Sequence, residues 1–304
     1  MTTKGQILEY YTAPGELTGA GNHSDRLAAL PTDVDRLVQT VRHLGIYDVV
    51  AQNFYGVALS EERAAAIHLR SAQQMLDHLF AVDDRPLDAD RAPQQRIACR
   101  CHAFTKLIVT FLRNRGVPAR SRCGFSAYFN PERFEDHWVC EYWNRDNKRW
   151  VLVDAQLDEV WHEKLGIDWD TSDVSRERFL VAADAWRRCR REGADPQHFG
   201  ISFHEGMRGL WFIAGNLVRD AAALNKMEML PWDVWGGAPG QEVTFSAEQL
   251  AFYDHLAALT QEPDQHFDEL QALYRNDQRL QVPQTVFNNL RQQAEPVVPQ
   301  PADM

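Results

Sequence analysis

Three residues between positions 101 and 154 are of types that together can carry out nucleophilic catalysis. Cys101 opens an apolar stretch that predicts a helix, His137 opens a hydrophobic strand, and Asp154 closes the next strand. A thiol attacks a carbonyl efficiently only after a base removes its proton, and the base needs a third group to orient it. The order of these residues, each at the end of a regular element, indicates a cysteine-dependent enzyme.

Position distinguishes Cys101 from the other cysteines. It lies at or near the start of the helix predicted for residues 101–115, where unpaired N–H groups and the positive end of the helix dipole stabilise a thiolate. Cys99 lies in the approach to this helix and would point elsewhere. Cys123 and Cys140 fall in predicted strands, where a free cysteine usually acts as a small hydrophobic residue. We therefore expect Cys101 to be the nucleophile.

The loop between the last two strands decides whether base and carboxylate meet. The strands are predicted at residues 137–143 and 149–153. A two- or four-residue loop sets His137 opposite Asp154 on one face of the hairpin, with Cβ atoms about 5 Å apart. A three- or five-residue loop sets His137 opposite Ala155 instead, and such loops are also common. The first register lets Asp154 fix the imidazole tautomer while the other ring nitrogen reaches the thiol.

The predicted elements give an α+β fold in which helices precede and follow a short run of strands. Helices are expected at residues 34–44, 60–80, 101–115, 208–226 and 250–259, the last behind a capping box at residues 246–249, and strands at 119–129, 137–143 and 149–153. Four segments are expected along the chain: a helical N-terminal extension (1–93), a catalytic core (94–165), a helical C-terminal region (166–295) and a disordered tail (296–304).

Several short blocks resemble the transglutaminase-like superfamily over about residues 94–160. They are Cys101-His102-Ala103-Phe104, Gly116-Val117-Pro118-Ala119-Arg120, Asp136-His137-Trp138-Val139 and Trp150-Val151-Leu152-Val153-Asp154. The resemblance implies a papain/transglutaminase-like core, a catalytic helix packed on a small antiparallel sheet. It also implies a Cys101 nucleophile, a His137 general base and acid, and an Asp154 orienting carboxylate. His-Trp-Val here replaces the commoner His-Ala-Trp-Val.

Three further residues are candidates for substrate binding. The oxyanion of an acyl-transfer reaction needs hydrogen-bond donors, for which the backbone N–H of Cys101 and the side-chain amide of Gln95 are candidates. Trp138, beside the base, and Trp235, in the loop 231–237, could wall a substrate cleft. Gln95 has a competing interpretation as a solvated residue of a connecting loop. The competing interpretation of both tryptophans is ordinary packing.

Composition limits the classes of function and compartment. The 304 residues carry a net charge of −11, which argues against general nucleic-acid binding. No apolar run is long enough to span a membrane, and the N-terminus lacks the pattern of a signal peptide. Five cysteines without a CxxC pair favour reduced thiols. We therefore expect a cytoplasmic protein.

The sequence predicts an amide hydrolase or an acyl or amide transferase that forms a thioester acyl-enzyme. The expected partners are an amide- or peptide-containing substrate and an optional amine acyl acceptor, with no cofactor, no metal, no nucleic acid and no membrane. A non-catalytic binding protein that retains the fold is one alternative. A metal-binding module is the other, built from Cys99, Cys101, His102, Cys123, His137 and Cys140, whose spacing fits no compact zinc site. The oligomeric state and natural substrate stay open.

Overall fold

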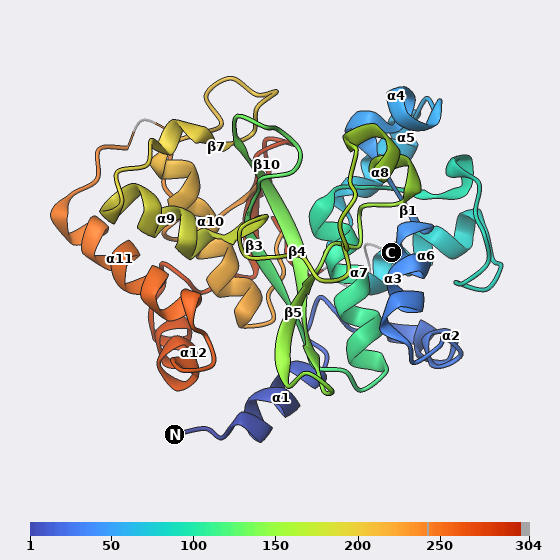
Figure 1. Cartoon of the computed structure of the whole chain (residues 1–304), viewed down its shortest axis with the longest axis horizontal. Coiled ribbons are helices and arrows are strands. Elements are labelled where there is room, and N and C mark those ends of the chain that lie inside the picture. The colour runs from blue at the N-terminus through green and yellow to red at the C-terminus, as the bar shows by residue number, and fades with distance from the viewer. Residues whose placement is uncertain (242, 299–304) are drawn as a thin grey trace. The chain divides into compact units, whose positions relative to one another are not determined.

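The structure is a computed structural model that describes residues 1–241 and 243–298 of an α+β chain (Figure 1). The chain forms two compact units. Unit 1 comprises residues 1–7, residues 122–138 and the chain from Ser175 onward, and unit 2 comprises residues 8–121 and 139–174. The division does not follow the four consecutive segments expected from the sequence, because strands β3 and β4 each begin in one unit and end in the other.

Unit 2 holds most of the N-terminal half of the chain. Its helices are α2 (Ser24–Ala28), α3 (Val34–Arg42), α4 (Ala51–Tyr55), α5 (Glu61–Ala64), α6 (Ala72–Val82), α7 (Cys101–Asn114) and α8 (Glu159–Leu165), and α1 (Lys4–Thr12) leads into it. Its strands are β1 (Gly45–Tyr47) parallel to β2 (Ile97–Cys99), the start of β3 (Ala119–Ser126), the second half of β4 (Phe134–Asn144), and β5 (Arg149–Val153) antiparallel to β4.

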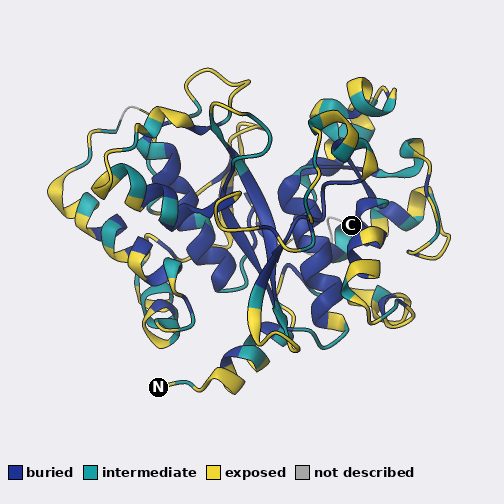
Figure 2. Cartoon of the chain, in the orientation of Figure 1, coloured by how far each residue is buried: buried dark blue, intermediate teal, exposed yellow. Residues whose placement is uncertain are grey.

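The predicted helix at residues 101–115 is confirmed as α7 and forms the centre of unit 2. It is buried along almost its whole length (Figure 2). Its apolar side chains share one hydrophobic cluster with α3, α6, β4 and β5, including Leu37, Val41, Leu76, Leu107, Phe111, Cys140, Val151 and Val153. The helix ends as predicted just before Gly116, whose φ of 73° suits a residue without a side chain. The helix-on-sheet arrangement expected for the catalytic core is therefore present.

The single helix predicted for residues 60–80 is wrong, because the chain breaks near its middle. After α5 it continues as a 3₁₀ helix over Ala65–His68, and Leu69 then takes an extended conformation. The second helix, α6, restarts with a capping box between Ser71 and Gln74.

Both predicted hairpin registers are also wrong. The loop between β4 and β5 contains four residues, but Asn144 pairs with Arg149 and Trp143 with Trp150. This register is shifted by two positions from the one that sets His137 opposite Asp154. Because the ladder ends at the pair Cys140–Val153, Asp154 lies beyond its last paired residue. A shift of two keeps each side chain on its expected face, since alternation along a strand has period two.

Unit 1 is built around the other ends of β3 and β4. Strand β6 (Phe179–Val181) runs antiparallel to β3, and β7 (Phe199–Gly200) runs parallel to β4. Its helices are α9 (Ala182–Arg191), α10 (Leu210–Leu224), α11 (Ala247–Gln261) and α12 (Phe267–Asn276). Helices α9, α10 and α11 lie side by side (Figure 1). The helix predicted at 208–226 and the capping box before α11 are confirmed.

The C-terminal region also contains strands that the sequence did not predict. Strand β9 (Thr285–Asn288) pairs with both β8 (Asp233–Val234) and β10 (Gln293–Pro296). The predicted start of the disordered tail at residue 296 is wrong. Pro296 is paired in β10, and Val297 is 3% exposed. Residues 299–304 of the predicted tail lie outside the described residues. Within the described chain, no helix has the length and apolar character needed to traverse a bilayer.

Candidate active site

Cys101 is the first residue of α7, as the sequence predicted. Arg100 precedes the helix with extended backbone, and its side chain does not cap the helix N-terminus. The guanidinium of Arg100 interacts electrostatically with Cys101 and is itself held by Asp48, with Nε–Oδ1 and Nη2–Oδ2 distances of 3.0 Å. The Cys101 residue is 5% exposed.

The preceding strand β2 packs tightly enough to fix the direction from which α7 starts. At Gly45 of β1, a Cβ atom would lie 2.5 Å from the ring of Phe104 and 3.1 Å from Sγ of Cys99. Only glycine permits this approach, and it brings β1 against the first turn of the helix that begins at Cys101.

Three of the other cysteines are poorly suited to attack a carbonyl. Burial raises the pKa of the Cys99 and Cys140 thiols, and it raises that of Cys189 to about 12. A thiol that keeps its proton is a weak nucleophile. All five cysteines lie in the described chain as free thiols.

His137 lies on β4 in unit 1 among aromatic rings. Its ring centroid is 4.9 Å from that of Phe129, 5.9 Å from that of Tyr128 and 6.3 Å from that of Phe179, each in a nearly perpendicular arrangement. These contacts restrict rotation of the imidazole, and the residue is 1% exposed. A base held in one orientation is what acid–base catalysis requires.

Asp136 faces away from His137, as the alternation of a strand predicts. Its Oδ1 accepts a hydrogen bond from Nδ2 of Asn216 on α10 at 2.7 Å. Burial raises the pKa of the Asp136 carboxyl, although the Asn216 hydrogen bond opposes this rise. Asp136 is therefore a structural carboxyl of the α10 side of the sheet.

Asp154 is buried in unit 2 directly after β5. Its Oδ1 accepts a hydrogen bond from the backbone N–H of Gln156 at 2.9 Å, and its own N–H donates to the Thr171 carbonyl at 2.9 Å. Arg42 donates to the Asp154 backbone carbonyl at 3.2 Å. These bonds fix the backbone and one carboxylate oxygen at the end of the strand.

Asp158, a second buried carboxylate shortly after β5, has a structural role. It caps α8 and accepts hydrogen bonds from Tyr55 at 2.8 Å and from Arg96 at 3.0 Å. Asp154 thus keeps its place as the candidate orienting carboxylate. Cys101 and Asp154 belong to unit 2 and His137 to unit 1, and the convergence of the three side chains stays a prediction.

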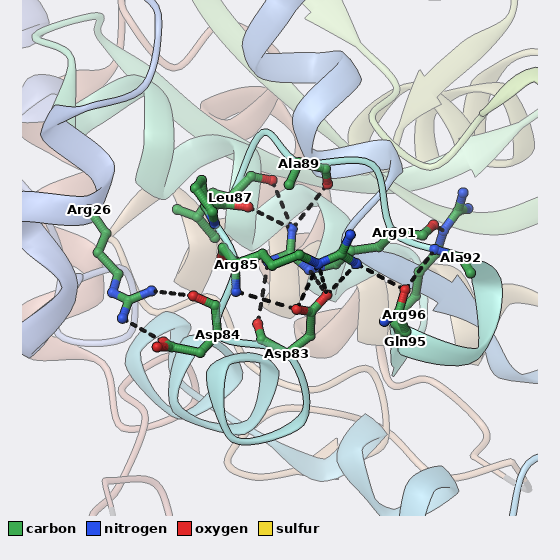
Figure 3. Close-up of polar contacts among 11 residues, drawn as sticks. Arg26, Asp83, Asp84, Arg85, Leu87, Ala89, Arg91, Ala92, Gln95 and Arg96 are labelled. Atoms are coloured by element: carbon green, nitrogen blue, oxygen red, sulfur yellow. Dashed lines mark hydrogen bonds and ion pairs between the residues drawn. The ribbon is translucent and has the colours of Figure 1, made fainter.

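Gln95 lies in a polar loop that is tied together by arginines (Figure 3). Its Oε1 accepts hydrogen bonds from Arg85 at 2.9 Å and from the Ala92 backbone at 3.2 Å, which caps the 3₁₀ helix Pro93–Gln95. Arg91 holds the same loop by donating to several of its carbonyl oxygens. This local capping role accounts for Gln95 without an oxyanion, so its part in catalysis stays a prediction without structural support.

The two candidate tryptophans are buried. Trp138 is 1% exposed, and Trp235 is 5% exposed with its Nε1 donating to the Leu280 carbonyl at 3.2 Å. These surroundings favour packing, so their contact with substrate also stays a prediction. Sequence reasoning missed Glu135, which strand alternation could have placed on the same face as His137.

The structure gives no support to the metal-binding alternative. Throughout the described residues, no three His, Cys, Asp or Glu side chains gather where they could hold a metal ion. Cys99, Cys123 and Cys140 are instead buried within the fold.

Comparison with known families extends the resemblance found in the sequence. A model described as the transglutaminase-like superfamily matches residues 52–155, which include all three predicted catalytic positions. The match covers about a third of the chain and supports a family of cysteine-dependent enzymes.

One solved structure is similar to this chain only at a low level. It is a protein from Cytophaga hutchinsonii that is provisionally described as a cysteine protease, and it is 17% identical with a TM-score of 0.22. The alignment covers 51% of this chain and 43% of that one, so the chain spans less than half the length of this protein. A TM-score this low carries no argument about fold or activity. A search of curated proteins found no match.

Proposed function

We propose that this protein is a cysteine-dependent amide hydrolase or acyl transferase that works through a thioester acyl-enzyme. The observation that carries the proposal is the location of Cys101 at the N-terminus of α7, inside the segment that matches the transglutaminase-like superfamily. A helix N-terminus and a neighbouring guanidinium are features that stabilise a reactive thiolate.

In the proposed acylation step, His137 takes the thiol proton and the Cys101 sulfur attacks the amide carbonyl carbon. A C–S bond forms and the carbonyl oxygen becomes an oxyanion, to which the Cys101 backbone N–H donates a hydrogen bond. When the C–N bond breaks, His137 gives its proton to the leaving amine. Asp154 holds the imidazole in the required tautomer and stabilises its protonated form.

In the deacylation step, water or a second amine attacks the thioester carbonyl. His137 accepts the proton of the attacking group, a C–O or C–N bond forms, and the thiolate leaves as the C–S bond breaks. Hydrolysis and amide transfer share every residue named here, and they differ only in which nucleophile reaches the thioester. We propose an amide- or peptide-containing substrate and a cytoplasmic location, which suits the free thiols.

The test uses p-nitrophenyl acetate as an activated acyl donor for the full-length protein. We expect a burst of p-nitrophenolate, and acid-quenched protein that carries one acetyl group on Cys101. Cys101→Ala should lose both the burst and the label, whereas Cys189→Ala, which removes a half-buried thiol of α9, should keep both. Acetylation at another residue, or full turnover by Cys101→Ala, would reject the proposal. Acetylation at a residue other than Cys101, without turnover, would favour a non-catalytic binding protein.

A further inference from the structure

Arg42 is a buried arginine at the end of helix α3. It is the last residue of this helix, and it is 5% exposed. Leu37, Val38 and Val41 anchor the same helix in the hydrophobic cluster of unit 2. The point from which the Arg42 side chain starts is therefore fixed by packing. A cation in the last turn also suits the negative end of the helix dipole.

The Arg42 guanidinium bonds to the end of β5 and to the chain segment beside it. Its Nη2 donates to the Asp154 backbone carbonyl at 3.2 Å and to Thr171 Oγ1 at 2.6 Å. The Thr171 backbone carbonyl in turn accepts from the Asp154 N–H at 2.9 Å. Both backbone polar groups of Asp154 are thus held, one by Arg42 and the other by the residue to which Arg42 is bonded.

The burial of Arg42 is costly for the fold. Its Nε is buried and has no hydrogen-bond partner in the described part of the chain. Burial also lowers the pKa of Arg42, because the charged form loses its hydration. Packed apolar residues in place of buried ionic groups are often neutral or stabilising, so stability alone gives no reason for an arginine here. This cost points to a use for the charge itself.

The charges near Arg42 indicate where its own charge acts. Nearby carboxylates oppose the lowering of the Arg42 pKa, and Asp154 has the largest effect among them. The others are Glu159, Asp158 and Asp170. Because the attraction between two charges is mutual, Arg42 favours the charged form of the Asp154 carboxylate.

Two of the other carboxylates have further partners nearby. Asp158 accepts a hydrogen bond from Arg96 at 3.0 Å. Glu159 Oε2 lies 3.5 Å from Nε2 of His43. A second histidine, His162, places its Nε2 3.3 Å from the hydroxyl oxygen to which the guanidinium donates. These are the groups, besides Asp154, whose charge is coupled to this network.

We propose that Arg42 is a positioning residue of the reaction, which holds Asp154 in place and in its charged form. This role rests on the proposed function, in which Asp154 orients His137 and stabilises its protonated form. Arg42 acts through Asp154 rather than on the reacting atoms. Removing a positive charge raises the pKa of neighbouring carboxyl, thiol and imidazole groups alike. The reaction should therefore need a higher pH once that charge is lost.

The experiment measures the rate constant for acetylation of Cys101 by p-nitrophenyl acetate across a pH series. Acetylation is followed by the intact mass of the acid-quenched, full-length protein. Arg42→Gln keeps an amide N–H for the Thr171 hydroxyl but lacks the charge. We expect the acid limb of its pH–rate profile to lie about half a pH unit or more above that of the wild type, which is about a threefold loss at a fixed pH on that limb. Arg42→Lys keeps the charge and should keep the wild-type limb.

Two further variants separate charge from orientation. Arg36→Gln removes the same charge from an exposed position of α3, and it should leave the whole profile as in the wild type. Thr171→Val keeps the charge but removes the acceptor that holds Nη2, so it should lower the plateau rate without moving the limb. Circular dichroism verifies that each variant is folded, and Arg42→Met replaces Arg42→Gln if the latter fails this check.

The outcomes separate this inference from the function beneath it. A wild type whose Cys101 is not acetylated contradicts the proposed function itself. A wild type that is acetylated on Cys101, with an Arg42→Gln variant whose acid limb stays at the wild-type pH, contradicts only the role of Arg42. A uniform loss of rate at every pH in Arg42→Gln would likewise show a purely structural residue.

Discussion

Removing the carboxylate of Asp220 should destabilise unit 1 more than any loss of a surface charge. Asp220 lies on α10 and is fully buried. Its Oδ1 accepts from Arg122 Nε at 3.1 Å and from the Cys123 backbone N–H at 2.9 Å, and its Oδ2 accepts from Arg122 Nη2 at 2.9 Å. Arg122 is also fully buried. Asp220→Ala therefore breaks three hydrogen bonds and leaves a buried guanidinium without this counter-charge.

The expected magnitude follows from this burial. Breaking a buried ion pair by removing one partner costs about 3–5 kcal/mol of unfolding free energy. For a unit of this size, each kcal/mol lowers Tm by about 2–4 °C, so the loss should be roughly 6–20 °C. Arg149 and Asp173 form an exposed pair, with side chains 47% and 42% accessible, and such pairs contribute about 0.2–1 kcal/mol.

The assay is urea and thermal unfolding followed by circular dichroism, with Asp173→Ala as the matched control. We expect Asp220→Ala to lose several times more unfolding free energy than Asp173→Ala. Equal losses would refute the reasoning, because Asp220 is buried and also accepts a hydrogen bond from the Cys123 N–H, whereas Asp173 is exposed.

Three smaller predictions concern single interactions. Ser71→Ala should cost about 1 kcal/mol in urea unfolding, because it removes the hydroxyl that caps the Gln74 N–H at the start of α6. Tyr55→Phe should cost about 1.5–3 kcal/mol in the same assay, since its hydroxyl donates to the buried carboxylate of Asp158. Burial raises the pKa of Asp136, so the folded state favours the protonated carboxyl and loses stability as the pH rises through that raised value. Asp136→Asn should therefore gain stability relative to the wild type above about pH 4, as measured by unfolding across a pH series.

The elements that sequence predicted correctly are long and carry several agreeing signals. For α7, an apolar stripe and a terminal Gly116 both indicate the same helix. Strands β6 to β10 contain two to four residues each, too few to show a period, and none was predicted. The two units also combine distant segments, which a linear division of the chain cannot represent.

Side-chain bonding within the loop explains the wrong hairpin register. The Asn144 Oδ1 accepts from the N–H groups of both Asp146 and Asn147, and Lys148 has a φ of 49°. An Asx-type turn of this kind closes a four-residue loop over residues 145–148, whose position along the chain the sequence did not show. Such local hydrogen bonds compete with the backbone pairing of β4 and β5, and the hydrophobic pattern of the sequence does not show them.

The chemistry-bearing residue types could be found from the sequence, whereas their surroundings could not. Cys101 at a helix start and Asp154 at a strand end follow from element boundaries. The capping role of Gln95 and the burial of Trp235 depend on contacts with residues 10 and 45 positions away, Arg85 and Leu280. No local pattern reports contacts of that kind.

The central claim is that Cys101, His137 and Asp154 act together as a catalytic triad. A double-variant cycle tests this claim most directly. The rate constant for acetylation of Cys101 by p-nitrophenyl acetate is measured for His137→Ala, Asp154→Ala and the double variant. Residues of a triad are strongly non-additive, so the double variant should be about as slow as His137→Ala alone. Losses that multiply in the double variant, or a His137→Ala variant as fast as the wild type, would contradict the account.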